Sequence, residues 1–515
     1  MRRVFALIVF ALCGATSSSA QTLGRVEFPN SGNAAAQAPF IRGLLLLHSF
    51  EYEDAAVQFA EAERADPSFA MAYWGEAMTH THPLWNQQNQ KAAVEILERL
   101  GPDPAARRAR AGTEQERMYL DAIEALYGDG PKAKRDTLFS RAVERITAAY
   151  PDDQEAWAFH ALWLMGLSQG VRNIPSYMRA GAIAQEIYRK NPEHPGALHY
   201  TIHAFDDPVH APLGLRAARE YSVIAAGADH AQHMTTHIFL ALGMWDETVA
   251  QNVVAAGPDS TRWRPGHYTA WMDYGLLQQG KYRDARRHLE VMRGNLPVPP
   301  RRATQAYMLG MRAHYLVNTE AWGDGVADWP LDTTVAPVGP KAMDAYAVGV
   351  ASLRRGRQAE ARAALARLEE YAARNDGDTD YGAAAVLPGI LLLHLQAEFA
   401  LAERKPEQAL GLLREAAGRT DTLPAEFGPP DIVKPVHERA GEILLDLRRA
   451  AEAQQEFTHA LALAPGRSRS LWGLGRAALE AGDTAVSEQA FAKLRENWKH
   501  GDSSLPAIPE ARATR

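Results

Sequence analysis

The sequence predicts an all-α fold built from repeated helical hairpins, because of its composition, a recurring interval and the placement of its prolines. Ala, Leu, Arg and Glu are abundant among the 515 residues, and these residue types favour helices. Near the C-terminus, Gly441 and Gly475 lie 34 residues apart, and Phe457 and Phe491 repeat that interval. Such an interval indicates one hairpin per repeat, in which a small residue lets the two helices approach and a bulky one fills the wedge. Pro465 falls between the copies, where it ends one hairpin before the next begins.

A second copy of the pattern lies near the N-terminus, so the repeat is not a local feature of one end. The corresponding small, aromatic and proline positions are Gly43, Tyr52, Ala55, Phe59, Ala62 and Pro67. These positions resemble the signature of the tetratricopeptide repeat family, and the resemblance covers most of residues 36–498. It implies a right-handed α-solenoid of tetratricopeptide helix-turn-helix repeats, with a concave groove that holds a ligand.

The expected organisation follows from the repeats and from the segments that interrupt them. It comprises a signal peptide at 1–20, an N-terminal array at 36–317 with insertions at 83–113, a connector containing Pro and Trp at 318–341, a C-terminal array at 342–498 and a flexible tail at 499–515.

The first twenty residues have the pattern of a secretory signal. Two arginines precede a short apolar run at 4–12, and Ser18 and Ala20 supply small side chains for cleavage. The only cysteine, Cys13, falls inside this segment, so the mature chain has no disulfide and no thiolate metal ligand. No later stretch approaches transmembrane length. We therefore expect a periplasmic or secreted protein.

Charge and motifs exclude several function classes. The formal net charge is −7, acidic and basic residues are interspersed, and no block of Lys and Arg interleaved with aromatics occurs. This pattern argues against nucleic acid as a partner. The sequence contains no HExxH, phosphate loop or dinucleotide glycine motif.

The most distinctive feature is a set of paired histidines in the middle of the chain. His199 and His203 are four residues apart, as are His233 and His237, so each pair shares one face of its helix. The interval from His199 to His233 is 34 residues, as is that from His203 to His237. The two pairs therefore occupy equivalent positions in consecutive hairpins.

The repeat numbering indicates which face the pairs occupy. Counted from the repeat signature, both pairs fall at positions 5 and 9 of the first helix of their hairpins, and the resemblance implies that positions 2, 5, 9 and 12 line the concave surface. Asp206 then takes position 12, His230 and His267 take position 2, and Tyr274 takes position 9. The predicted ligand-binding groove is lined by His199, His203, Asp206, His230, His233, His237, His267 and Tyr274.

Two interpretations of this groove remain open. The first and main hypothesis is a binding or scaffold protein that holds a peptide or protein partner in the groove. The alternative is a metal-binding protein, because neutral imidazole binds Zn, Cu, Ni and Fe, and three His, or two His with a carboxylate, form a catalytic-type site. The metal ligands would be His199, His203, Asp206, His233 and His237. Asp206 or Asp207 is alternatively the acceptor that orients a ring.

The sequence makes no cofactor certain, and it leaves open whether the chain is an enzyme. The stretches HYTIHAFDDP (199–208) and HMTTHIF (233–239) also resemble those of an exported bacterial tetratricopeptide subfamily with paired histidines. This second resemblance draws attention to the histidine face without naming a function.

Overall fold

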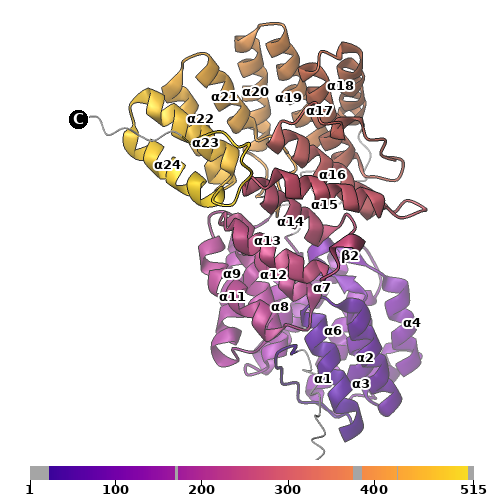
Figure 1. Ribbon diagram of the computed structural model, residues 1–515. Coiled ribbons are helices and arrows are strands. Elements are labelled where there is room, and N and C mark those ends of the chain that lie inside the picture. The colour runs from indigo at the N-terminus through magenta and orange to yellow at the C-terminus, as the bar shows by residue number, and fades with distance from the viewer. Residues whose placement is uncertain (1–21, 169–171, 375–384, 426, 509–515) are drawn as a thin grey trace, which may run out of the picture.

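The computed structural model describes residues 22–168, 172–374, 385–425 and 427–508, and this part of the chain is almost entirely helical (Figure 1). The predicted all-α class is confirmed: the described residues form a series of helices in which successive helices pack against each other as hairpins. The predicted signal peptide at 1–20, with Cys13, lies outside the described residues, as does the end of the predicted tail. None of the described helices combines the length and the apolar character that crossing a bilayer requires.

The lower part of Figure 1, coloured indigo to magenta, contains the first thirteen helices and the short elements between them. The helices are α1 (Ala34–His48), α2 (Tyr52–Ala65), α3 (Ala70–Met78), α4 (Gln90–Leu100), α5 (Pro104–Arg108), α6 (Glu114–Tyr127), α7 (Lys132–Ala149), α8 (Gln154–Gly166), α9 (Ile174–Lys190), α10 (Pro195–Ala204), α11 (Ala211–Ile224), α12 (Asp229–Ala241) and α13 (Trp245–Ala256). Between α3 and α4 lie β1 (Thr81–His82), η1 (Pro83–Trp85) and β2 (Gln87–Gln88), and the two strands pair antiparallel.

The remaining helices continue into the upper part of Figure 1, which ends in yellow. They are α14 (His267–Gln278), α15 (Tyr282–Gly294), α16 (Arg302–Thr319), α17 (Val338–Arg354), α18 (Gln358–Ala373), α19 (Leu387–Ala402), α20 (Pro406–Thr420), α21 (Val436–Asp446), α22 (Ala450–Leu463), α23 (Ser468–Ala481) and α24 (Thr484–Asn497). The short helix η2 (Ser260–Arg262) precedes α14, and η3 (Val326–Asp328) lies between α16 and α17.

The two repeat copies found in the sequence pack in the same way. A Cβ atom on Gly43 of α1 would lie 2.9 Å from the ring of Phe59 in α2, and one on Gly441 of α21 would lie 2.9 Å from Phe457 in α22. Real Cβ atoms do not approach this closely, so each hairpin needs glycine where its two helices cross. The 34-residue pattern therefore reports how the helices pack.

The buried apolar residues form two clusters. One runs from Leu23 to Ala241 and the other from Trp263 to Leu494, so the core divides near residues 242–262, whereas the sequence placed a change of array at 318–341. Helices α16 and α17 stay packed across that connector, because Arg312 binds both carboxylate oxygens of Asp344 at 2.7 Å. Such a bidentate pair holds the two helices in one stack.

The beginning of the N-terminal array, around α1, contacts later helices of the same array. The backbone N of Arg25 donates to the carbonyl of Glu193 at 2.8 Å, and the hydroxyl groups of Tyr221 and Ser49 lie 3.2 Å apart. The residues that follow α1 therefore lie against α10 and α11, and they close the inner side of the superhelix.

The C-terminal repeats fold back onto the middle of the chain. The indole N–H of Trp245 donates to the carbonyl of Gly466 at 3.0 Å, and the backbone N of Ser468 donates to Gln278 at 3.0 Å. The turn between α22 and α23 is therefore packed against α13 and α14.

Candidate metal centre

Six imidazole rings gather where α10, α12 and the start of α14 lie side by side, and they are here called the imidazole cluster. Its members are His199, His203, His230, His233, His237 and His267. Neighbouring ring centroids are between 4.3 Å apart, for His233 and His267, and 6.2 Å apart, for His230 and His233. The structure thus brings together all six histidines that the sequence placed at the predicted groove.

The cluster is more buried than the face of an open groove. His199 and His233 have no exposed surface, and His230 is 9% exposed. Phe50, just after α1, covers one side, with its ring centroid 4.2 Å from that of His199. Trp271 covers the other side, 4.2 Å from His267. Most of the rings are therefore enclosed by aromatic side chains from neighbouring hairpins.

The cluster contains two sets of three ligand atoms. The α12–α14 triad consists of His233, His237 and His267, and the α10–α12 triad consists of His199, His203 and His230. Within each triad the candidate ligand nitrogens all lie within 4.8 Å of one another. Three imidazole nitrogens at this spacing form the ligand set of a catalytic-type metal site.

Two hydrogen bonds set the tautomer of His233. Its Nδ1 lies 2.7 Å from Oδ1 of Asn252, and the Nδ2 of that amide donates to the carbonyl of Thr248 at 2.9 Å. The amide orientation is therefore set, and Nδ1 of His233 must be the donor. In the neutral ring Nε2 then carries a lone pair, which points into the triad.

The other two rings of the α12–α14 triad are held from outside in the same manner. Nδ1 of His237 donates to the carboxylate of Asp206 at 2.6 Å, and Nδ1 of His267 lies 2.9 Å from the hydroxyl of Tyr307. Nε2 of His237 is consequently directed inward, 3.0 Å from Nε2 of His233. Metal-binding histidines are oriented by such outer partners.

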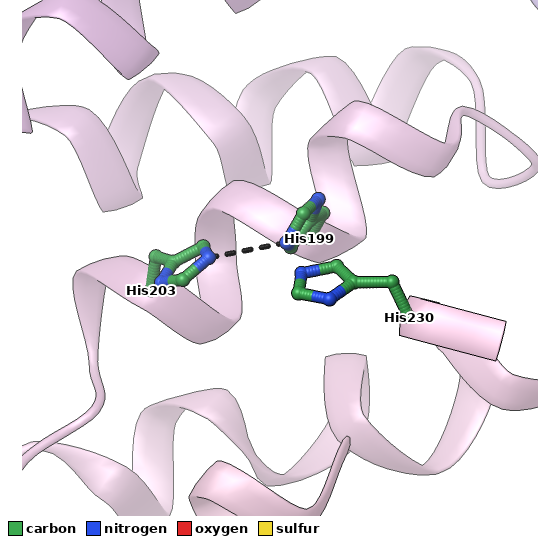
Figure 2. Close-up of side chains that lie close together, drawn as sticks. All are labelled: His199, His203 and His230. Carbon is green, nitrogen blue, oxygen red and sulfur yellow. Dashed lines mark hydrogen bonds between the residues drawn. The ribbon is translucent and has the colours of Figure 1, made fainter. Parts of the chain in front are cut away.

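The α10–α12 triad is shown in Figure 2, where its three rings turn toward one another. Nδ1 of His199 donates to the backbone carbonyl of His48 at 2.6 Å, which leaves Nε2 of His199 unprotonated in the neutral ring. Nε2 of His203 lies 3.1 Å from that atom. Nε2 of His230 is buried and has no hydrogen-bond partner among the described residues.

Burial favours the neutral form of these rings. Burial, together with the nearby rings of His237 and His48, lowers the pKa of His199 to about 3, although its hydrogen bond to the carbonyl of His48 acts to raise the pKa. Burial, with His237 beside it, also lowers the pKa of His267 to about 3. The pKa values of His203, His230 and His233 lie well below the usual value, first through burial and then through the neighbouring rings. Neutral imidazoles present lone pairs at pH 7, as metal binding requires.

Asp206 and Tyr274 lie outside the set of converging nitrogens. Asp206 orients His237 from outside, which is the second of the two roles that the sequence allowed for it. Tyr274 points away from the cluster, with its ring 5.1 Å from His314 and its hydroxyl accepting from Arg467 at 3.1 Å. It belongs to the contact between α14 and the C-terminal repeats.

Several contributors to the site were not identified from the sequence. They are the carbonyl of His48, the side chains of Asn252 and Tyr307, and the covering rings of Phe50 and Trp271. No spacing marked them, since they come from hairpins other than those carrying the histidine pairs or from the other helix of a hairpin.

A second buried group lies beside the cluster and consists of His48, Glu155 and His194. All three side chains have no exposed surface, and their candidate ligand atoms also lie within 4.8 Å of one another. A third group, Asp421, His437 and His459, is on the C-terminal array and is partly exposed.

A cavity of about 720 Å³ borders one residue of the α12–α14 triad. Its lining includes His267 itself and the neighbouring Tyr268, and the exposed side chains of Arg262 and Arg264 line it as well. His267 is therefore the member of the triad that lies beside this cavity.

Comparisons with known proteins add only distant similarities of fold. No protein-family model matches this sequence. No curated protein matches it either. Among solved structures, the human IFIT1 dimer with m7Gppp-AAAA is 11% identical, with 92% of this chain and 90% of that chain covered and a TM-score of 0.37. Yeast Tom70 is 11% identical, with 90% and 91% covered and a TM-score of 0.28. Similarities at this level carry no argument about function.

Proposed function

We propose that this chain is a metal-binding repeat protein that holds a first-row transition metal ion on the α12–α14 triad. One observation carries the proposal: the outer nitrogens of His233, His237 and His267 each have a hydrogen-bond partner, and their inner nitrogens converge. Binding of a peptide or protein partner in the concave groove, and export of the chain, stay predictions.

The short distance between two of the inner nitrogens supports an ion. Nε2 of His233 and Nε2 of His237 are 3.0 Å apart, and two facing lone pairs at that distance repel each other. A positive charge between them removes the repulsion, either as a shared proton or as a metal ion. Nitrogens bound at about 2.0–2.1 Å to a tetrahedral ion are roughly 3.3 Å apart, so only a small displacement is needed.

The surroundings supply the other requirements of a metal site. The partners of the outer nitrogens fix the rings in the binding orientation, and the cavity beside His267 borders one of them. Three imidazoles leave one coordination position of a tetrahedral ion free for water or a substrate. Zn, Cu, Ni and Fe all suit imidazole ligands.

The test is metal analysis of the full chain, expressed without an affinity tag. We expect stoichiometric metal after purification, and a higher melting temperature when metal is restored to the stripped protein; at a free concentration 100 times Kd the gain in stability is about 2.7 kcal/mol. His233→Gln should retain less metal than wild type and gain less melting temperature when metal is restored. The matched control is His394→Gln on α19, an equally buried imidazole far from the cluster, which should match wild type in both.

Two results would overturn the proposal. One is a wild-type chain that retains no metal and shows no thermal shift with Zn, Cu, Ni or Fe. The other is a folded His233→Gln chain that binds as much metal, with the same thermal shift, as His394→Gln. A proton shared between His233 and His237 would then explain the short distance between their Nε2 atoms.

A further inference from the structure

We infer that the imidazole cluster holds two metal ions, the second on the α10–α12 triad of His199, His203 and His230. This inference rests on the proposed function, because it adds an ion to the same cluster. The observations that carry it belong to the second triad alone.

The ligand atoms of the α10–α12 triad are as close together as those of its neighbour. All three lie within 4.8 Å of one another, and Figure 2 shows the rings directed toward a common space between α10 and α12. The centroid of His199 is 4.8 Å from that of His203 and 5.2 Å from that of His230. The spacing fits three nitrogens around one ion.

Protons alone do not satisfy this triad. The single proton of neutral His199 is used on the carbonyl of His48, and His203 has one proton to donate to Nε2 of His199. Nothing is left for Nε2 of His230, which is buried without a partner. A buried polar atom without a partner is unfavourable, and an ion bound to all three nitrogens would supply that partner.

A single ion would not satisfy the whole cluster. A tetrahedral ion takes about four ligands, and the cluster presents six imidazoles. At least two of the six rings would then have no bond to the metal. Two ions, each on three nitrogens, use all six rings and leave a free position on each ion.

The two ions would also be close to each other. His203 and His237, from different triads, have ring centroids 6.1 Å apart, and those of His230 and His233 are 6.2 Å apart. Because the triads adjoin through these rings, the ions would belong to one centre and would interact.

The first test is the number of ions per chain. Stripped wild-type protein reloaded with Zn²⁺ or Cu²⁺ and desalted should retain two ions, His230→Gln one, His267→Gln one, and the double variant none. His394→Gln should retain two, and melting curves of each stripped variant check that it folds. Two ions in wild type that both survive in a folded His230→Gln chain would overturn the inference.

The second test asks whether the ions are neighbours. In the Cu²⁺ form, magnetic coupling should reduce the electron paramagnetic resonance signal well below the copper content, whereas His230→Gln should give a mononuclear signal that accounts for all its copper. A full mononuclear signal from a wild-type chain with two copper ions would overturn the inference.

The outcomes separate the two proposals. A wild-type chain that retains no ion contradicts the proposed function and this inference together. A wild-type chain that retains one ion, lost in His267→Gln and kept in His230→Gln, supports the proposed function and overturns the second site.

Discussion

The imidazole cluster and the group of His48, Glu155 and His194 are neighbours in the N-terminal array, joined by His48, whose carbonyl accepts a hydrogen bond from His199. Both are buried, and both place ligand-type atoms within 4.8 Å of one another. They differ in the chemistry of the facing atoms. In the imidazole cluster, ring nitrogens face other ring nitrogens, whereas in the second group two rings face the carboxylate of Glu155.

In the Glu155 group, the N–H groups of two rings face the carboxylate, whose negative charge lies between them. The backbone N of Ala197 donates to Nδ1 of His194 at 3.2 Å, so the proton of His194 is on Nε2, which lies 3.2 Å from one oxygen of Glu155. Nε2 of His48 lies 2.5 Å from the other oxygen. The carboxylate therefore has a hydrogen bond to His48 and lies within ion-pair distance of His194, although Nε2 of His194 and the oxygen that faces it make no hydrogen bond among the described residues. Proximity of ligand-type residues is therefore not sufficient to identify a metal site. A ring nitrogen that carries a proton cannot bind a metal ion, so the positions of the protons must be considered as well.

The largest expected effect is the loss of stability in Glu155→Gln, which disrupts the group of His48, Glu155 and His194. In Glu155→Gln the amide still accepts from His48, but its NH₂ faces the N–H of His194. Breaking a buried, hydrogen-bonded charge network costs about 3–5 kcal/mol, and we expect a loss of that size in urea unfolding of the N-terminal array. The bound metal per chain should not change.

The control for this change is Glu98→Gln on α4, an exposed carboxylate, which should leave the unfolding midpoint in place. A Glu155→Gln chain that unfolds like the control would show that the network contributes little. A Glu155→Gln chain that folds but loses its metal would show that this group, too, is part of the metal centre.

A smaller effect is expected from the outer partner of a cluster ring. Asp206→Asn keeps an acceptor near Nδ1 of His237 but removes its charge, so the ring becomes a weaker ligand. Such changes lower metal affinity about 10–100-fold, and competition with a chelator of known affinity would measure the loss. The number of ions at saturation should stay that of wild type. A lower number at saturation would instead make Asp206 a ligand, as the sequence-based metal set had it.

The sequence predicts the hairpins and the meeting of the histidine pairs, because both depend on contacts between neighbouring repeats. Gly43 and Gly441 each face the phenylalanine that the repeat pattern assigns to them. The 34-residue interval places the two histidine pairs on adjacent first helices, where the ring centroids of His203 and His237 are 6.1 Å apart. His233 and His267 are also 34 residues apart, and their ring centroids are 4.3 Å apart.

What the sequence does not predict depends on how many repeats curve together. The tight winding that brings His48 and Phe50 against α10 is the sum of small rotations at every hairpin, and no single repeat encodes it. The return of the C-terminal repeats, which engages Tyr274 with Arg467, has the same origin. The burial of the cluster and the donors around Glu155 therefore appear only in three dimensions.

The smallest effect expected is a pH dependence confined to the Glu155 group. Burial opposes ionisation of Glu155, but His48 and His194 outweigh it and lower its pKa from 4.5 to about 2. A carboxyl whose pKa is lowered on folding stabilises the fold above its unfolded pKa, and this stabilisation is lost as the pH falls toward the folded value. Glu155→Gln lacks this contribution. The difference in unfolding free energy between wild type and Glu155→Gln should therefore shrink by about 1 kcal/mol between pH 5.5 and pH 3.5. Urea unfolding of both stripped proteins would measure it, and a difference that stays constant or grows on acidification would mean that the carboxylate is not held ionised by its two histidines.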